Sequence, residues 1–370
     1  MRSMKTALLV VCSAVTLLAQ NPARKVTDEE VMRVHRSALL IDTHNDVPNE
    51  QNGHERTTVG FDIGAHADQA QTDLPRLRQG GVGAVFFVSY VSSRFAGGRN
   101  RASNRANQFI DSILYDIVGR YPDDFMLATT ADQIEEAHKQ GKIAALIGVE
   151  GGHAIENSLD ILRGFYKRGA RYLTLTHSNT NDWADSSGDV NDASITHHNG
   201  LTDFGKDVVR EMNKLGMMVD ISHVADKTFW DALEVSKAPL IASHSSCRAL
   251  ANAPRNMTDQ MIEALAKKGG IIQVNFYCNF LTNDKPPHAS VNDVVAHIDH
   301  IRQIVGVDSI GIGSDFDGID CAPEGLEDVS KFPNLTRALL EKGYSAEDIR
   351  KIYGGNFLRV MRAVEAAAGK

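Results

Sequence analysis

A histidine and an aspartate stand two residues apart at the end of the strand-like run Leu39–Asp46, which ends in Asp-Thr-His-Asn-Asp. Side chains two apart on a strand point to the same side, so His44 and Asp46 can reach one ion together. Imidazole nitrogen and carboxylate oxygen are both typical zinc ligands. The spacing therefore predicts that His44 and Asp46 bind one metal ion.

Seven further apolar runs follow along the chain, each short and rich in β-branched residues. None alternates cleanly between apolar and polar residues, which is typical of strands covered on both faces. The runs are Val82–Tyr90, Ile143–Glu150, Arg171–His177, Met217–His223, Pro239–His244, Gly270–Phe276 and Ile310–Asp315.

Stretches of helical periodicity lie between these runs, so strand and helix alternate. This alternation predicts an α/β fold, a TIM-like (β/α)8 barrel, in which functional groups sit at the carboxyl ends of the strands. The helical stretches are Ala102–Tyr121, Ala131–Gln140, Asp160–Arg168, Leu201–Leu215, Asp226–Ser236, Asp259–Lys268 and Val291–Val305. The strand ends supply His44, Asp46, Glu150, His177, His223, His244 and Asp315.

This set of side chains suits two metal ions. His44 and Asp46 would hold one ion, and His223 and His244 the other. Glu150 would bridge them, because Gly151 and Gly152 after it let the backbone turn close to a metal. Each ion then has three protein ligands and one open position, which is typical of a catalytic site.

Other interpretations of single residues stay open at this point. Glu150 could form a salt bridge with an arginine, and His223 and His244 could be core histidines with backbone partners. We expect His153, His197 and His198 not to be ligands, because they lie in loops or one turn past a strand end.

The 370 residues, 42% of them hydrophobic, suit one large barrel domain. Residues 1–19 resemble a cleaved signal peptide, with a basic start and the apolar stretch Ala7–Ala19. We therefore expect an exported protein, periplasmic or secreted, with no stable membrane span after cleavage and a single barrel domain over residues 20–370. A retained N-terminal anchor is the alternative.

The formal net charge is −8 and no basic run is present, so nucleic acid is not an expected partner. Outside residues 1–19 the chain has three cysteines, Cys247, Cys278 and Cys321. Their positions beyond the last three strands permit one disulfide, and the spacing leaves the pairing open.

Taken together, the motifs resemble the membrane (renal) dipeptidase family, peptidase family M19, and most closely its secreted bacterial members. The resemblance covers about residues 35–365. It is carried by Ile41–Pro48, Asp73–Gly83, Gly148–His153, Leu175–His177, Asn181–Trp183, Asp220–His223, Ser243–Ser246, Pro254–Asn256, Val274–Tyr277 and Gly313–Gly318.

The resemblance implies a barrel of the metal-dependent amidohydrolase type with two zinc ions per chain, and a homodimer. It implies hydrolysis of free dipeptides, L-Xaa-L-Xaa or L-Xaa-D-Xaa, by attack of a metal-bridging hydroxide. The matched positions assign the same zinc ligands as above, with Glu150 as the bridge.

The resemblance also implies roles that spacing alone does not indicate. His177 matches a histidine that binds the substrate carbonyl and stabilises its developing negative charge. Arg255 matches an arginine that binds the substrate's C-terminal carboxylate. Asp315 matches an aspartate beside the bridging water, suited to accept its proton, and Tyr277 lines the pocket.

Two other functions compete with this one. Another binuclear amidohydrolase, such as a lactonase, deaminase or N-acyl-amino-acid hydrolase, often has His-x-His after the first strand and a carboxylated lysine after the fourth. Here the first strand gives His-x-Asp, and Arg171–His177 contains no lysine. A binding protein on an inactive hydrolase scaffold would lack ligands, whereas every expected ligand is present.

Overall fold

The computed structural model describes residues 25–48 and 62–369, so the predicted signal peptide lies outside the described residues. Nine parallel strands form one sheet, and eight of them close into a barrel because β4 pairs with β2 as well as with β5. The barrel strands are β1 Leu40–Asn45, β2 Val82–Tyr90, β4 Ile143–Glu150, β5 Ala170–Thr174, β6 Met218–Asp220, β7 Ile241–Ser245, β8 Ile271–Val274 and β9 Ile310–Ile312. The predicted (β/α)8 barrel is confirmed.

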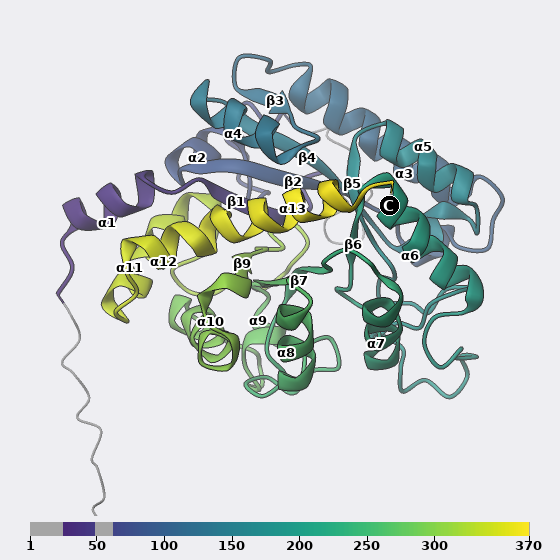
Figure 1. The fold of residues 1–370 in the computed structure, drawn as a ribbon. Coiled ribbons are helices and arrows are strands. Elements are labelled where there is room, and N and C mark those ends of the chain that lie inside the picture. The colour runs from purple at the N-terminus through teal and green to yellow at the C-terminus, as the bar shows by residue number, and fades with distance from the viewer. Residues whose placement is uncertain (1–24, 49–61, 370) are drawn as a thin grey trace, which may run out of the picture.

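Helices surround the barrel (Figure 1). Thr130, Thr202 and Thr258 each cap the helix that follows, accepting a hydrogen bond from a backbone N–H of its first turn. The α-helices are α1 Asp28–Arg36, α2 Leu74–Gln79, α3 Arg101–Asp111, α4 Ala131–Lys139, α5 Leu159–Lys167, α6 Asp203–Leu215, α7 Asp226–Val235, α8 Asp259–Lys267, α9 Cys278–Leu281, α10 Val291–Val305, α11 Phe332–Glu341, α12 Ala346–Arg350 and α13 Asn356–Ala367. Two π-helical segments, Ser112–Val118 and Lys351–Gly355, extend α3 and precede α13.

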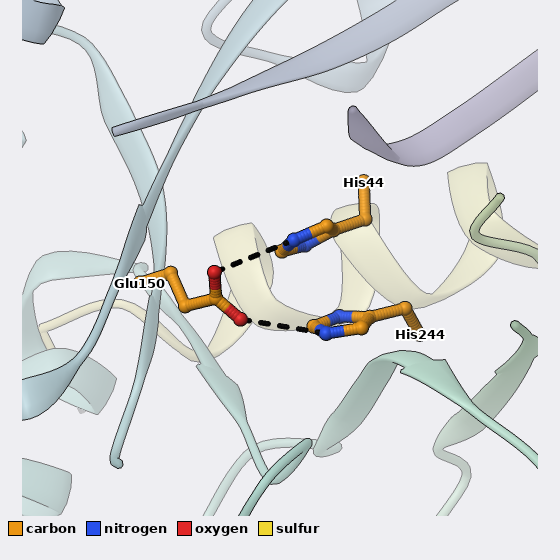
Figure 2. Close-up of side chains that lie close together, drawn as sticks. All are labelled: His44, Glu150 and His244. Carbon is orange, nitrogen blue, oxygen red and sulfur yellow. Dashed lines mark ion pairs between the residues drawn. The ribbon is translucent and has the colours of Figure 1, made fainter. Parts of the chain in front are cut away.

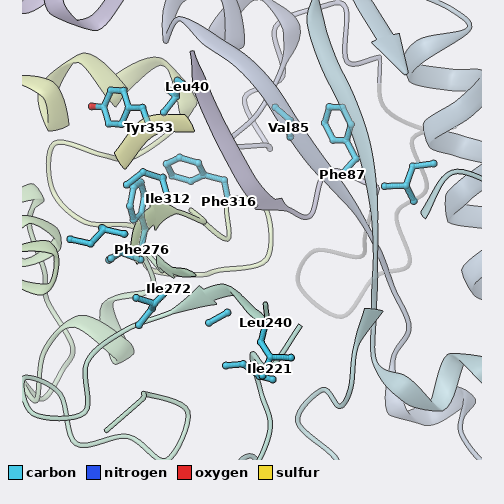
Figure 3. Packing of buried hydrophobic residues seen from close by; sticks show 14 of the residues in the cluster. Leu40, Val85, Phe87, Ile221, Leu240, Ile272, Phe276, Ile312, Phe316 and Tyr353 are labelled. Atoms are coloured by element: carbon cyan, nitrogen blue, oxygen red, sulfur yellow. The ribbon is translucent and has the colours of Figure 1, made fainter. Parts of the chain in front are cut away.

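Alternate residues of each strand pack into two different cores. Val85 and Phe87 of β2 belong to a large cluster that the strands share with the surrounding helices (Figure 3). Phe86 of the same strand belongs to a smaller cluster with Leu146, Tyr172 and residues of α13. Both faces of the strands are therefore apolar, which explains why the runs do not alternate in sequence.

Helix α13 closes the amino-terminal end of the barrel. Arg359 donates to the carbonyl oxygens of Gly269 and Asp308, which precede β8 and β9, at 2.8 and 2.7 Å. Phe357 packs edge-on against Phe86, with ring centroids 5.5 Å apart. The opposite end, where the strands finish, stays available for the polar residues.

Two details of the sequence prediction were wrong. β3, Phe125–Leu127, pairs with β4 as an additional strand outside the closed barrel, and it was not predicted. Several strands also end before the polar residue that was assigned to them. β6 ends at Asp220 and β9 at Ile312, so His223 and Asp315 each lie three residues beyond their strand, both in a left-handed conformation with a φ of +67°.

Candidate metal centre and substrate pocket

The carboxyl ends of six barrel strands bring all seven predicted strand-end residues to one point. Three overlapping groups of potential ligands form there. They are His44 with Glu150 and His244, Glu150 with His177 and His223, and His44 with Asp46 and Asp315. Glu150 and His44 each belong to two of these groups.

Several distances between these side chains exceed those of direct hydrogen bonds and are close to the spacing of ligands around one cation, although His223 Nε2 lies 2.9 Å from His244 Nε2. His44 Nε2 lies 3.4 Å from Asp46 Oδ2 and 3.6 Å from Glu150 Oε2. The other carboxylate oxygen of Glu150, Oε1, lies 3.0 Å from His223 Nε2 and 3.4 Å from His244 Nε2. Ligands bound tetrahedrally to one zinc ion lie roughly 3.3–3.5 Å apart, given metal–ligand bonds of about 2.0–2.1 Å.

Figure 2 shows the rings of His44 and His244 one above the other, each facing one oxygen of Glu150. The two ring centroids are 3.6 Å apart. His44 Nε2 and Glu150 Oε1 are buried and accept or donate no hydrogen bond among the described residues. Buried polar atoms without partners are costly, so this arrangement fits bound metal ions.

The charges of the cluster lead to the same conclusion. Burial alone would lower the pKa of His44, but the carboxylates of Glu150 and Asp46 outweigh it and raise that pKa well above its usual value. Burial lowers the pKa of His223 and His244 well below the usual value, so both rings are neutral and able to coordinate a metal. Buried carboxylates that surround neutral imidazoles attract a cation.

Asp315 lies beside this cluster and is held by hydrogen bonds from its backbone and its side chain. Its backbone N–H donates to His44 O at 3.0 Å, and Asn275 Nδ2 donates to its Oδ2 at 2.8 Å. Its other oxygen, Oδ1, faces His44 Nε2 at 3.8 Å. Burial, together with the nearby carboxylates, raises the pKa of Asp315 to about 7, a value suited to proton transfer near neutral pH.

His177 lies three residues beyond the end of β5, between Tyr90 and His223. Its ring centroid is 4.6 Å from that of Tyr90 and 4.5 Å from that of His223. Burial lowers the pKa of His177 to about 4, so the ring is neutral at pH 7 and carries one N–H. It therefore can donate a single hydrogen bond into the pocket.

A cavity of about 360 Å³ opens over the cluster. Tyr277, assigned to the pocket from the sequence, lines it. Gly318 lines it too, and a Cβ atom there would come within 2.3 Å of Asp46 Oδ2 and 2.8 Å of Asp315 Oδ1. Glycine thus lets the backbone pass close to the carboxylates.

Arg255 lines an adjoining cavity of about 490 Å³ that shares Ser178, His223 and Phe280 with the first. Its Nη1 donates to Ser245 Oγ at 2.7 Å and its Nη2 to His244 O at 2.6 Å. Its buried Nε has no partner among the described residues. Burial lowers the pKa of Arg255 to about 10, so it stays positively charged at neutral pH.

The three histidines not expected to be ligands lie outside the three metal-binding groups of the described chain. His153 is buried next to Gly151, and His197 and His198 lie in the loop after β5, where they contact backbone oxygens of Asp192 and Asn181.

The disulfide left open by the sequence joins Cys278 to Cys321, and Cys247 is buried and free. It links the loop after β8, which carries Tyr277, to the loop after β9, which carries Gly318.

Sequence reasoning missed several residues that shape the site. Tyr90 ends a predicted strand but was not assigned to the pocket, although it lines the cavity. Tyr172 lies within the predicted apolar run Arg171–His177, and its hydroxyl lies 3.0 Å from His44 Nδ1. Gly318 could have been assigned to the pocket from the sequence, because it follows Asp315 by three residues in the Gly-Ser-Asp-Phe-Asp-Gly motif.

Comparison with known proteins decides the family. The model of the membrane dipeptidase family, peptidase family M19, matches residues 28–370. The chain belongs to this family. It is a hydrolase of the metallopeptidase type, and the resemblance seen in the sequence is confirmed.

Individual relatives agree with this assignment. "Dipeptidase tcpJ" of Claviceps purpurea (strain 20.1) is 44% identical over 302 residues, which cover 80% of this chain and 70% of the relative. A metallopeptidase from Rhodobacter sphaeroides, solved with a phosphinate mimic of the dipeptide L-Ala-D-Ala, is 26% identical with a TM-score of 0.76. That match covers 88% of this chain and 99% of the other.

The fold is also that of a probable dipeptidase, PvdM, from Pseudomonas aeruginosa, with a TM-score of 0.81 and 24% identity over 92% of this chain and 99% of that one. Among residues 25–48 and 62–369, no helix combines the length and the apolar character needed to cross a membrane.

Proposed function

We propose that this protein is a zinc-dependent dipeptidase that hydrolyses the peptide bond of free dipeptides. The observation that carries the proposal is the position of Glu150. Its Oε2 lies 3.6 Å from His44 Nε2, and its Oε1 lies 3.0 and 3.4 Å from Nε2 of His223 and of His244, so one carboxylate reaches histidines of both assigned metal sites. We assign His44 and Asp46 to one zinc ion, His223 and His244 to the other, and Glu150 to both. The Rhodobacter sphaeroides relative, which binds a mimic of L-Ala-D-Ala, supports the substrate class.

When bound, the metal pair would supply a water of lowered pKa and would polarise the scissile carbonyl. Asp315 would accept the proton of that water and return it to the leaving amine, because its Oδ1 faces the cluster while its Oδ2 is fixed by Asn275. His177 would donate its single N–H to the carbonyl oxygen as negative charge develops there. Losing one such donor typically costs roughly 2.7–4 kcal/mol of the barrier reduction.

Arg255 would bind the C-terminal carboxylate of the substrate. Two of its N–H groups are used by His244 O and Ser245 Oγ, which fixes the plane of the guanidinium. The Nε–H and the remaining Nη–H groups can then bind a carboxylate at a fixed distance from the metal cluster. This geometry favours dipeptides over longer peptides.

The deciding experiment is hydrolysis of L-Ala-L-Ala, L-Ala-D-Ala, L-Ala-L-Ala-L-Ala and N-acetyl-L-Ala-D-Ala, with added zinc and with a chelator. We expect zinc-dependent cleavage of the two free dipeptides only. If zinc is bound and all four peptides stay intact, the dipeptidase assignment is wrong and another binuclear amidohydrolase activity replaces it.

The location and assembly of the protein are proposals from the sequence. The basic start and the apolar stretch Ala7–Ala19 support export, and the family resemblance supports a homodimer.

A further inference from the structure

The ring of His244 is held from behind by a chain of hydrogen bonds that the proposed mechanism does not use. His244 Nδ1 lies 2.8 Å from Ser243 Oγ, and Ser243 Oγ lies 2.6 Å from Asp220 Oδ2. His244 and Ser243 lie on β7, and Asp220 is the last residue of the neighbouring strand β6. These hydrogen bonds therefore connect two neighbouring strands directly beneath the metal cluster.

Asp220 is fully buried and accepts hydrogen bonds at both oxygens. Thr174 Oγ1 and Ser243 Oγ each donate to Oδ2 at 2.6 Å. The backbone N–H groups of Ser243 and Ser222 donate to Oδ1 at 2.8 and 3.1 Å. Four donors thus surround the two oxygens of Asp220, and each oxygen accepts two hydrogen bonds.

The direction of each hydrogen bond follows from this arrangement. A serine hydroxyl has one hydrogen, and the carboxylate of Asp220 requires it. Ser243 Oγ must then accept from His244, which places the ring hydrogen on Nδ1. The lone pair of His244 is left on Nε2, the atom that faces Glu150 Oε1 at 3.4 Å.

A different set of partners produces the same result for His44. Tyr172 Oη lies 3.0 Å from His44 Nδ1 and donates to the carbonyl oxygen of Thr43 at 3.2 Å. His44 thus also turns Nδ1 toward a hydroxyl and Nε2 toward the cluster. The hydrogen bonds behind His244 end at the side-chain carboxylate of Asp220, whereas those behind His44 end at the neutral backbone carbonyl of Thr43.

We propose that Asp220 is a positioning residue that acts through Ser243 to fix His244 in the tautomer whose Nε2 binds metal. The proposal rests on the metal site of the proposed function. A carboxylate that accepts a hydrogen bond from a ligating histidine, directly or through a hydroxyl, raises the basicity of the ring and fixes its orientation. Metal binding at His244 therefore depends on Ser243 and Asp220 although neither touches the ion.

Thr174 gives a matched control for this proposal. Thr174 Oγ1 and Ser243 Oγ donate to the same oxygen of Asp220 at the same distance, 2.6 Å, but only Ser243 continues to a histidine. Thr174→Val removes one donor of the buried carboxylate and leaves the hydrogen bonds from Asp220 through Ser243 to His244 intact. These hydrogen bonds are called the relay. Ser243→Ala removes one donor and breaks the relay.

The test measures zinc bound by wild type, Ser243→Ala and Thr174→Val at a series of free zinc concentrations set by a chelator buffer. Loss of an outer hydrogen-bond partner typically lowers metal affinity by roughly 10–100-fold, and we expect a fall of this order for one ion in Ser243→Ala only. Thermal unfolding of the zinc-free proteins shows whether the two variants lose similar stability. Asp220→Asn, which keeps the shape of the side chain, is measured in the same way if Ser243→Ala does not fold.

Zinc affinity equal to wild type in Ser243→Ala would overturn the proposal, and so would an equal fall in Thr174→Val, because the network would then act through structure alone. Failure of the proposed function looks different. Wild type would then bind no zinc, or would bind it and cleave no dipeptide, before any variant is compared.

Discussion

The two ends of the barrel are built from the same eight strands, but one end is apolar and the other carries the candidate metal ligands. At the amino-terminal end, Phe86 packs against Tyr172 and against Phe357 of α13, with ring centroids 5.0 and 5.5 Å apart. At the carboxyl end, buried carboxylates and imidazoles crowd around Glu150. Apolar packing at the amino-terminal end stabilises the fold. Burying charged groups at the carboxyl end costs free energy, which the apolar packing offsets.

Tyr172 is the residue at which the two ends meet. Its ring belongs to the apolar core inside the barrel, and its hydroxyl reaches His44 Nδ1 at 3.0 Å. The closed end thus fixes the orientation of a ligand at the open end. Residues that stabilise the fold and residues that form the site therefore lie only a few positions apart on each strand. Substitutions at the first kind should lower stability, and substitutions at the second kind should lower activity.

Replacing Glu150 should have the largest effect on activity. Glu150→Gln keeps the volume but removes the charge and one ligating oxygen. We expect zinc content to fall and kcat/KM to drop by more than the roughly 10–100-fold that loss of an outer partner costs. Glu156→Gln is the matched control, because Glu156 binds Ser103 and the backbone of Asn100 outside the metal groups. Equal zinc content and kcat/KM in both variants would contradict a bridging role.

Asp315→Asn should come next. The variant keeps the shape of the side chain but cannot take up a proton, and general acid–base groups typically contribute about 10²–10⁴-fold to the rate. We expect kcat to fall by this order while zinc content is retained. Asp317→Asn, in the same loop but bonded to the Gln71 backbone, should leave kcat close to wild type. A kcat for Asp315→Asn equal to that of Asp317→Asn would remove Asp315 from the mechanism.

Arg255→Met should have a smaller effect that depends on the substrate. A hydrogen bond between charged groups is worth about 1.5–3 kcal/mol, so kcat/KM for L-Ala-L-Ala should fall roughly 10- to 100-fold. The C-terminal amide of the same dipeptide lacks the carboxylate, and wild type and variant should cleave it at similar rates. Arg248→Met is the control, since Arg248 pairs with Asp226 instead. A parallel loss on acid and amide would show that Arg255 does not bind the carboxylate.

Phe357→Ala, at the closed end, should leave the chemistry almost unchanged and reduce stability. Deleting a buried phenylalanine ring typically costs about 3–5 kcal/mol of unfolding free energy. Urea unfolding should show this loss, while kcat/KM of the folded variant stays close to wild type. Reduced kcat/KM in fully folded protein would mean that the two ends are not separable.

The central strands of the fold were predictable because a short, continuous apolar run rich in β-branched residues is typical of a strand buried on both faces. The bounds of β2 and β4 agree with the predicted runs Val82–Tyr90 and Ile143–Glu150. The ends of β6 and β9 were not predictable, because the residues that follow them, up to His223 and Asp315, continue the same pattern of residue types after the strand pairing has stopped.

The candidate ligands were predictable for a similar reason, since parallel strands in a barrel bring their carboxyl ends together. The partners behind the ligands were not. Tyr172 and Asp220 are ordinary strand residues in the sequence, and only the packing of neighbouring strands places them against His44 and Ser243. The pairing of Cys278 with Cys321 likewise depended on the positions of two loops.

The measurement that tests the central claim most directly is a zinc titration of metal-free protein, followed by bound zinc and L-Ala-L-Ala hydrolysis in the same samples. The account predicts that activity is absent without metal and reaches its maximum at about two bound ions per chain, as expected for a two-metal site. Full activity in protein shown to be free of metal would contradict it, and so would saturation with zinc that produces no hydrolysis.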